Sequence, residues 1–123
     1  MTTGEMQVIV LQEIDRYQTV SIPEAMAAVG EEAMGELLWE CGENVVLWAN
    51  MSRPFAEAMI ELKHTGVIEL EPMSKLGMML GGAMLNMPVV RRPPPKGYAK
   101  PHWCPVWLRR PDTKKRARQR NEH

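Results

Sequence analysis

The sequence has only two cysteines, Cys41 and Cys104, among its 123 residues. Two cysteines cannot build the disulfide framework that stabilises many small secreted proteins. The N-terminal residues also lack a basic region followed by an apolar stretch and a small-residue cleavage site, so no secretory signal is visible. We therefore expect a cytoplasmic protein in a reducing compartment.

Long apolar runs are missing as well. The longest apolar stretch covers residues 76–90 and is interrupted by three glycines, an asparagine and a proline. It is shorter than the roughly 18–20 residues of a membrane-spanning helix, so we expect no membrane span. A buried helix or hairpin is the favoured interpretation of this stretch. Because basic residues flank it at Lys75 and Arg91, an interfacial or re-entrant segment is the alternative.

Motifs for catalysis or cofactor binding are also absent. The sequence contains no P-loop, dinucleotide fingerprint or Gly-x-Ser-x-Gly elbow. His102 and Cys104 are spaced as a ligand pair, but a structural zinc site needs four ligands, so only a partner chain could complete it. Glu61 and His64 form a single Glu-x-x-His spacing where di-iron bundles use two. We therefore expect a non-enzymatic chain without metal or cofactor.

Charge is divided unevenly along the chain. The totals are equal, with 15 basic and 15 acidic residues. Residues 1–90 nevertheless hold 13 acidic and 4 basic residues, and residues 91–123 hold 11 basic and 2 acidic residues. The chain therefore divides into an acidic part, 1–90, with a net charge of −9, and a basic part, 91–123, with a net charge of +9.

The acidic part has the apolar spacing and capping residues of a small α+β domain. Apolar residues at helical spacing predict helices, and we expect these helices to begin after the N-cap residues Thr2, Ser21, Asn44 and Ser52. Alternating apolar and polar residues predict strands. In chain order, we expect a helix over 4–18, a strand over 19–22, a helix over 23–41 that Gly30 could divide, a short helix over 45–48, a helix over 53–64, a strand over 67–72 and a returning strand over 88–90.

The segment from Met51 to Leu70, MSRPFAEAMIELKHTGVIEL, resembles the winged helix-turn-helix superfamily. In that superfamily the third helix ends in a leucine, a few polar residues and a glycine, and the chain then enters the first wing strand. The resemblance covers about residues 5–90 and implies a winged-helix-like fold, with the helix over 53–64 in the place of the helix that usually enters the DNA major groove.

The charge of that helix does not suit the role that the resemblance implies. Its exposed face would present Arg53, Glu57, Glu61, Lys63 and His64. Duplex DNA carries one negative charge per ~1.7 Å of its axis, and the two glutamates would lie in this field on an already acidic body. We therefore expect the acidic part to contact a protein partner or to form a homodimer.

The composition of the basic part, 91–123, predicts an extended, proline-rich arm. Seven of the ten prolines lie between Pro88 and Pro111, and proline removes a backbone donor. Cations that bind phosphates are interleaved here with aromatic rings that could stack on bases, a combination typical of RNA or single-strand binding. The candidate nucleic-acid-binding residues are Arg91, Arg92, Lys96, Lys100, Arg109, Arg110, Lys114, Lys115, Arg116, Arg118, Arg120, Tyr98, Trp103 and Trp107.

Two functions are compatible with this pattern. The leading hypothesis is a DNA- or RNA-binding regulatory or accessory protein, of the kind that acts in transcription regulation, in which the arm binds phosphates and the acidic part contacts protein. The alternative is a small structural subunit of a larger assembly, anchored to a neighbour by the arm. A third interpretation of the arm itself, opposite in charge to the acidic part, is that it folds back on its own chain.

Overall fold

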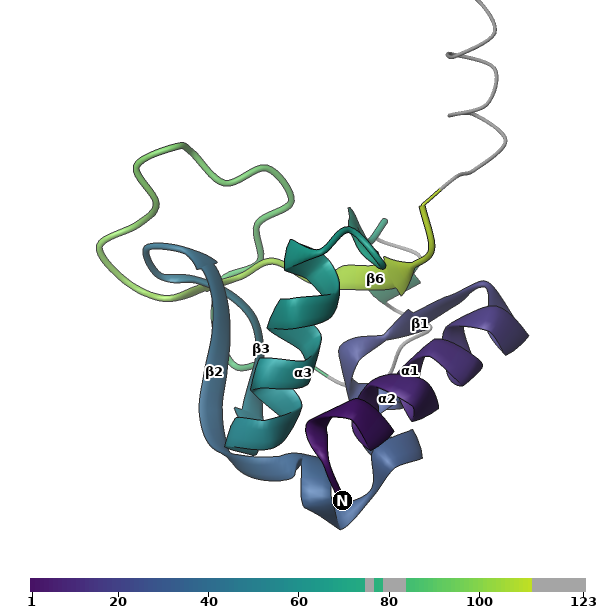
Figure 1. Ribbon diagram of the computed structural model, residues 1–123. Helices are drawn as coiled ribbons and strands as arrows, with labels where there is room; N and C mark the ends of the chain where they lie inside the picture. Colours follow the sequence, from purple (N-terminus) through teal and green to yellow (C-terminus); the bar gives the residue numbers. More distant parts are fainter. Residues whose placement is uncertain (75–76, 79–83, 112–123) are drawn as a thin grey trace, which may run out of the picture.

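The structure is a computed structural model that describes residues 1–74, 77–78 and 84–111 of the chain. The fold is mixed α+β. Within the described residues it has three α-helices and two small three-stranded sheets (Figure 1). The α+β prediction is therefore confirmed.

The N-terminal helix and the strand after it form as predicted. Helix α1 spans Thr3–Tyr17 and begins with a capping box, in which Thr2 and Glu5 exchange side-chain and backbone hydrogen bonds. Strand β1, Thr19–Ser21, follows directly. Ser21 then caps helix α2, Ile22–Val29, through a second capping box with Glu24. These caps supply partners for backbone N–H groups that a helix start leaves unsatisfied.

The helix predicted over 23–41 is wrong beyond Val29. Gly30 has a φ of 95°, a conformation that glycine adopts easily and that cannot continue an α-helix. A 3-10 turn, η1, Glu31–Ala33, follows, and the chain then becomes strand β2, Met34–Gly42.

The short helix predicted over 45–48 is also a strand. Strand β3, Val45–Met51, pairs antiparallel with β2 across a turn at Glu43 and Asn44. Asn44 has a φ of 56°, in the left-handed region that asparagine tolerates in turns. The β-branched and aromatic side chains of β3 favour a pleated, buried surface over a helix.

The third helix agrees closely with its prediction. Helix α3 spans Arg53–His64, with Ser52 as its N-cap and Pro54 in its first turn. Gly66 has a φ of 77° and ends the helix as expected. Strand β4, Glu69–Pro72, follows.

The last two strands come from the predicted arm. Strand β6, Val106–Arg109, lies between β1 and β4 and pairs antiparallel with both. Strand β5, His102–Trp103, runs parallel to β3 in the second sheet. The expectation that residues 88–90 pair with β4 is therefore wrong, because β6 occupies that position and Val89 makes only an isolated bridge to Trp103.

One hydrophobic core joins the helices and both sheets. Helices α1 and α3 pack against one another, as Figure 1 shows, and bury their apolar stripes. Leu108 of β6 is fully buried in the same cluster. Removal of such a side chain from a packed core costs about 2–5 kcal/mol. Residues of the predicted arm therefore contribute directly to the core.

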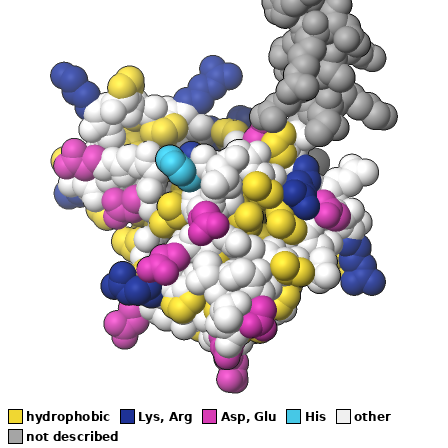
Figure 2. All heavy atoms as spheres, in the orientation of Figure 1, with side chains coloured by type: hydrophobic (Ala, Val, Ile, Leu, Met, Phe, Trp, Pro, Cys, Tyr) yellow, Lys and Arg dark blue, Asp and Glu magenta, His cyan; other side chains and the backbone are white. Residues whose placement is uncertain are grey.

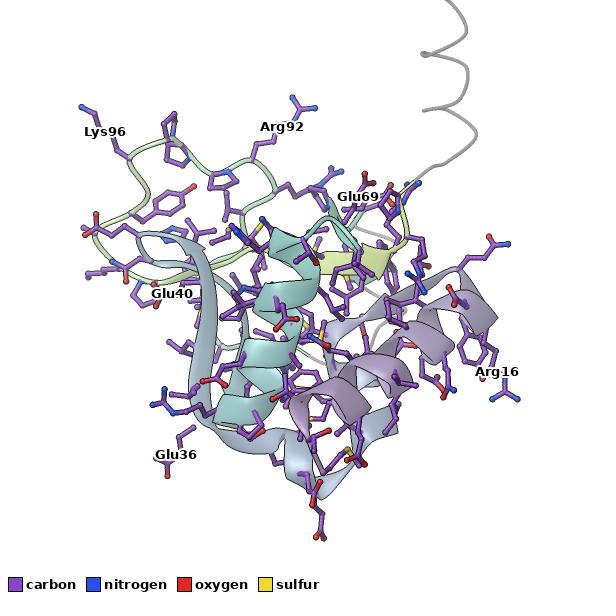
Figure 3. All side chains as sticks on the ribbon, in the orientation of Figure 1. Arg16, Glu36, Glu40, Glu69, Arg92 and Lys96 are labelled. Atoms are coloured by element: carbon purple, nitrogen blue, oxygen red, sulfur yellow. The ribbon has the colours of Figure 1, made fainter. Side chains whose placement is uncertain are left out.

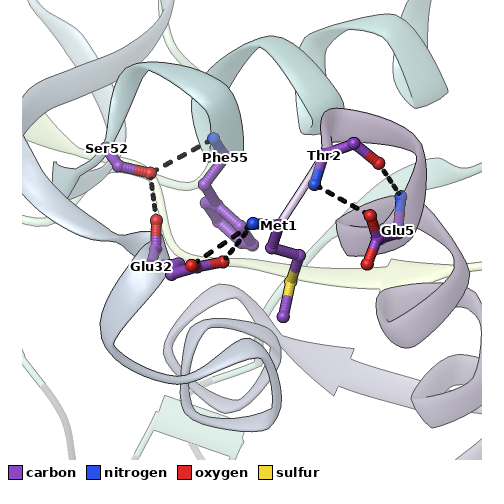
Figure 4. A network of polar contacts seen from close by, with 6 residues as sticks. All are labelled: Met1, Thr2, Glu5, Glu32, Ser52 and Phe55. Atoms are coloured by element: carbon purple, nitrogen blue, oxygen red, sulfur yellow. Dashed lines mark hydrogen bonds and ion pairs between the residues drawn. The ribbon is translucent and has the colours of Figure 1, made fainter.

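Glu32 links the N-terminal amino group to Ser52, the N-cap of α3 (Figure 4). The amino group of Met1 lies 3.0 Å from the Glu32 carboxylate, which raises the pKa of that amino group. Ser52 Oγ donates to the Glu32 carbonyl at 2.6 Å and accepts from the backbone N–H of Phe55. This network joins η1, the N-terminus and the start of α3.

The apolar stretch 76–90 is described only at 77–78 and 84–90, so the buried helix or hairpin expected there, and the alternative of an interfacial or re-entrant segment, lie largely outside the described residues. Among the helices that the structure describes, none is long and apolar enough to cross a membrane.

Candidate nucleic-acid interface

The candidate site centres on the segment between β4 and β5. Residues 84–101 of this segment, all of which the structure describes, are called the basic loop below. It lies beside the β2–β3 turn in Figure 1. The backbone N–H of Tyr98 donates to the Glu43 carbonyl at 3.0 Å, and Asn44 Nδ2 donates to the Tyr98 carbonyl at 2.8 Å. The far end of the basic loop is thus held on the hairpin turn.

Gly97 makes this attachment sterically possible. Its φ is 70°, and a Cβ at this position would collide with the Glu43 carbonyl oxygen. The basic loop can approach the turn this closely only because position 97 has no side chain.

The aromatic candidates of the arm face the protein itself. Trp103 is 3% exposed, and its Nε1 donates to the Leu47 carbonyl at 3.2 Å. Tyr98 is half-buried and stacks on His102 with ring centroids 3.6 Å apart. Trp107 is also half-buried, beside Gly77. Trp103 therefore offers no face for a base, and one face of the Tyr98 ring is already covered.

Two of the cationic candidates are engaged with acidic residues of the body. Arg109 reaches Glu71 at 3.3 Å and Glu69 at 4.0 Å. Arg110 donates to both carboxylate oxygens of Asp15, at 3.0 and 3.2 Å. Through Arg109 and Arg110, the predicted arm therefore folds back on its own chain.

The other predicted nucleic-acid-binding cations that the structure describes all belong to the basic loop. Figure 3 shows Arg92 and Lys96 pointing outward from it, and Figure 2 shows basic side chains projecting at the same edge of the molecule. Within the described residues, none of their four side chains forms an ion pair or hydrogen bond, and the only side-chain contact of this kind to these residues is from His102 Nδ1 to the Lys100 backbone carbonyl at 2.9 Å. These four exposed cations are Arg91, Arg92, Lys96 and Lys100.

An open hollow adjoins the start of this group. Glu71, Pro72, Arg91 and Arg92 line it, and its volume is about 520 Å³. Glu71 is the carboxylate that Arg109 already contacts, so its negative charge beside the two loop arginines is partly balanced. The predicted cations Lys114, Lys115, Arg116, Arg118 and Arg120 lie outside the described residues.

The cysteines show no sign of activation. Cys41 is exposed and Cys104 is buried, and desolvation raises the pKa of both thiols. A raised pKa lowers the thiolate fraction, which is the reactive form. Among the residues that the structure describes, no group of three or more His, Cys, Asp or Glu side chains is arranged to hold a metal ion.

Sequence reasoning missed the residues that hold the basic loop in place. Asn44 was interpreted as a helix cap, although Gly42-Glu43-Asn44 between aromatic and β-branched residues is also a turn signal. Gly97, directly after Lys96 in a proline-rich run, signals a turn as well. Nothing local indicates that the Leu47 carbonyl accepts from Trp103, because 56 residues separate the two.

Comparisons with known proteins found no matching family model, no matching curated protein and no matching solved structure.

Proposed function

We propose that this chain is a non-enzymatic, winged-helix-like protein that binds nucleic acid through backbone phosphates, in a regulatory or accessory role. The observation that carries the proposal is the set of four exposed loop cations without an intramolecular partner in the described structure. Residues 1–90 hold 13 acidic and only 4 basic residues, so these four cations make the basic loop positive on an otherwise acidic domain. Cations grouped on a projecting segment match the spaced negative charges of a nucleic-acid backbone.

The arrangement of the strands supports the winged-helix part of the proposal. Helix α3 is followed by Gly66 and then by β4, which pairs antiparallel with β6. The basic loop lies in the connection between these two strands, the position of a wing in the superfamily that the sequence resembles. The β2–β3 hairpin between α2 and α3 is a departure from the element order of that resemblance.

The aromatic rings favour duplex phosphates over single-stranded bases as the ligand. Base stacking needs an accessible ring, and each stacked base contributes about 1–3 kcal/mol. Trp103 is buried and Tyr98 is stacked on His102. Phosphate contacts need only the cations, which remain exposed.

The test compares duplex DNA with a single-stranded oligonucleotide of equal length, using the full chain over a salt series. The double variant R92A/K96A removes two loop cations. We expect it to weaken duplex binding. The slope of log affinity against log salt should become shallower by about 2, because each phosphate contact contributes about 0.9 to its magnitude.

The matched control is R16A/R53A, which removes two exposed cations from α1 and α3. We expect this variant to keep the wild-type slope. Equal effects of the two double variants would contradict binding through the basic loop, because any loss of positive charge would then suffice. Point variants are required here, since deletion from residue 91 onward would remove β5 and β6.

The alternative of a structural subunit anchored by its arm receives less support. An anchoring strap needs aromatic side chains that are available to a neighbour. Trp103 instead fills the chain's own core, where its ring also lies 5.8 Å from that of Trp48.

A further inference from the structure

The outer side of strand β2 carries a row of exposed side chains that is called the β2 row here. Met34 is 54% exposed and Leu38 is 48% exposed, and Glu36 and Glu40 alternate with them. Leu37 and Trp39, which lie between these positions, are half-buried and buried, so the exposed side chains share the outer face of the strand despite its irregular pairing. The β2 row therefore combines apolar and acidic groups on one surface.

The intervening positions of β2 confirm this orientation. Trp39 is 4% exposed and packs in the core. Gly35 faces the start of α3, because a Cβ there would lie 2.7 Å from Ser52 Cα. The β2 row thus points away from the core, on a strand that, within the part of the chain that the structure describes, has a strand neighbour on one side only.

The backbone of β2 is poorly suited to accept another strand. Its pairing with β3 shifts register at several points between Met34 and Gly42. Bulges of this kind twist an edge and prevent regular strand addition. A partner would therefore use the side chains of the β2 row rather than its backbone groups.

The basic loop carries the complementary chemistry. Met84 is 69% exposed and Val89 is 42% exposed, close in sequence to Arg91 and Arg92. Apolar groups beside cations on the basic loop match apolar groups beside carboxylates on the β2 row. The chain as a whole has a formal net charge of zero, so no overall charge repulsion separates two copies.

Within one chain, only one end of the β2 row lies near the basic loop. Figure 3 shows Glu36 at the opposite end of β2 from Arg92 and Lys96. Figure 3 shows Glu40 at the end of β2 nearer the basic loop, and within the described residues neither Glu36 nor Glu40 forms an ion pair with a loop cation. Both carboxylates are therefore available to the basic loop of a second molecule.

We propose that the β2 row of one copy docks the basic loop of a second copy. The contact joins two different patches, so a two-fold dimer makes it twice and a head-to-tail assembly makes it once at each interface. Salt weakens it, because exposed ion pairs are screened.

Sedimentation velocity on the full chain, without nucleic acid, tests this proposal. We expect concentration-dependent association at low salt that decreases at high salt. The variant E36R/E40R reverses the charge of the β2 row, and R92E/K96E reverses the charge of the basic loop. Each variant alone is expected to associate at least about tenfold more weakly, from loss of the pairs and new repulsion.

Mixing the two variants provides the sharpest result. The basic β2 row of one variant then faces the acidic loop of the other, and association is expected to return. The control E57R/E61R makes the same charge change on the exposed side of α3 and is expected to associate like the wild type. Circular dichroism verifies that each variant is folded, and the loop variant keeps the test valid if the strand variant unfolds.

Three results would overturn the proposal. One is a wild-type chain that stays monomeric at low salt up to about 1 mM, the concentration scale of weak complexes. The others are unchanged association of either reversed variant and failure of the mixture to associate. Because the samples contain no nucleic acid, these outcomes are independent of nucleic-acid binding.

Discussion

Arg110 and Asp15 form a two-point ion pair that joins residues 95 positions apart in the sequence. The Arg110 Nε and Nη2 atoms lie 3.0 and 3.2 Å from the two carboxylate oxygens of Asp15. The pair connects the residue after β6 to the last turn of α1.

The Arg110–Asp15 pair is expected to add little stability despite its geometry. Both side chains are about half exposed, at 42% and 57%, and exposed pairs contribute about 0.2–1 kcal/mol. R110A should therefore lower the free energy of unfolding by no more than about 1 kcal/mol in urea denaturation. A double-mutant cycle with D15N isolates the pair, and a coupling energy well above this value would contradict the expectation.

Replacement of Gly97 should destabilise the attachment of the basic loop. In G97A the new methyl group would collide with the Glu43 carbonyl, and the residue would also have to hold a φ of 70°. Gly66 has a similar φ of 77° but has nothing within 4 Å of its Cβ position. We expect G66A to cost about 1 kcal/mol from backbone strain alone and G97A to cost more in thermal or urea unfolding. Equal losses would show that the close contact with Glu43 is unimportant.

Trp103 is expected to act in stability rather than in base stacking. Its indole is 3% exposed and donates to the Leu47 carbonyl. W103A should lower the free energy of unfolding by about 3–5 kcal/mol, as for other buried aromatic residues. Y17A, at a position that is 58% exposed, should change it by less than about 0.5 kcal/mol. A folded W103A variant of wild-type stability that had lost nucleic-acid affinity would contradict this assignment.

Stability should depend on Glu5 in acid. Hydrogen bonds from the backbone and side chain of Thr2 lower the pKa of Glu5 from its ordinary value of 4.5. A lowered pKa in the folded state gives stability that is fully present above the unfolded value and is lost as pH falls through the folded value. E5Q should therefore lose less stability than the wild type as the pH falls below 4.5. Urea midpoints measured at several pH values check this, and identical acid dependence of the two chains would show that ionisation of Glu5 does not contribute to stability.

Local signals predicted the parts of the fold that depend on local interactions. The capping boxes at Thr2 and Ser21 and the Ser52 cap correctly indicated where the three helices begin. Gly66 correctly indicated the end of α3. These features act within one helical turn, so the sequence pattern contains them in full.

The wrong predictions concern elements whose structure depends on residues distant in the sequence. Leu37 and Cys41 fit helical spacing with Val29 and Ala33, but pairing with β3 makes the segment from Met34 to Gly42 a strand. The proline-rich arm gave no local sign that β6 inserts between β1 and β4. The exposed loop cations follow from composition, whereas the burial of Trp103 and the engagement of Arg110 follow only from tertiary contacts. Tertiary packing commonly overrides local preference in strands.

The measurement that tests the central claim most directly is the salt dependence of duplex DNA binding by the full chain and by R91A/R92A/K96A/K100A. If the basic loop contacts phosphates, the variant should bind more weakly at every salt concentration. Its slope of log affinity against log salt should be shallower by about 3–4. A folded variant with wild-type affinity and slope would contradict the account.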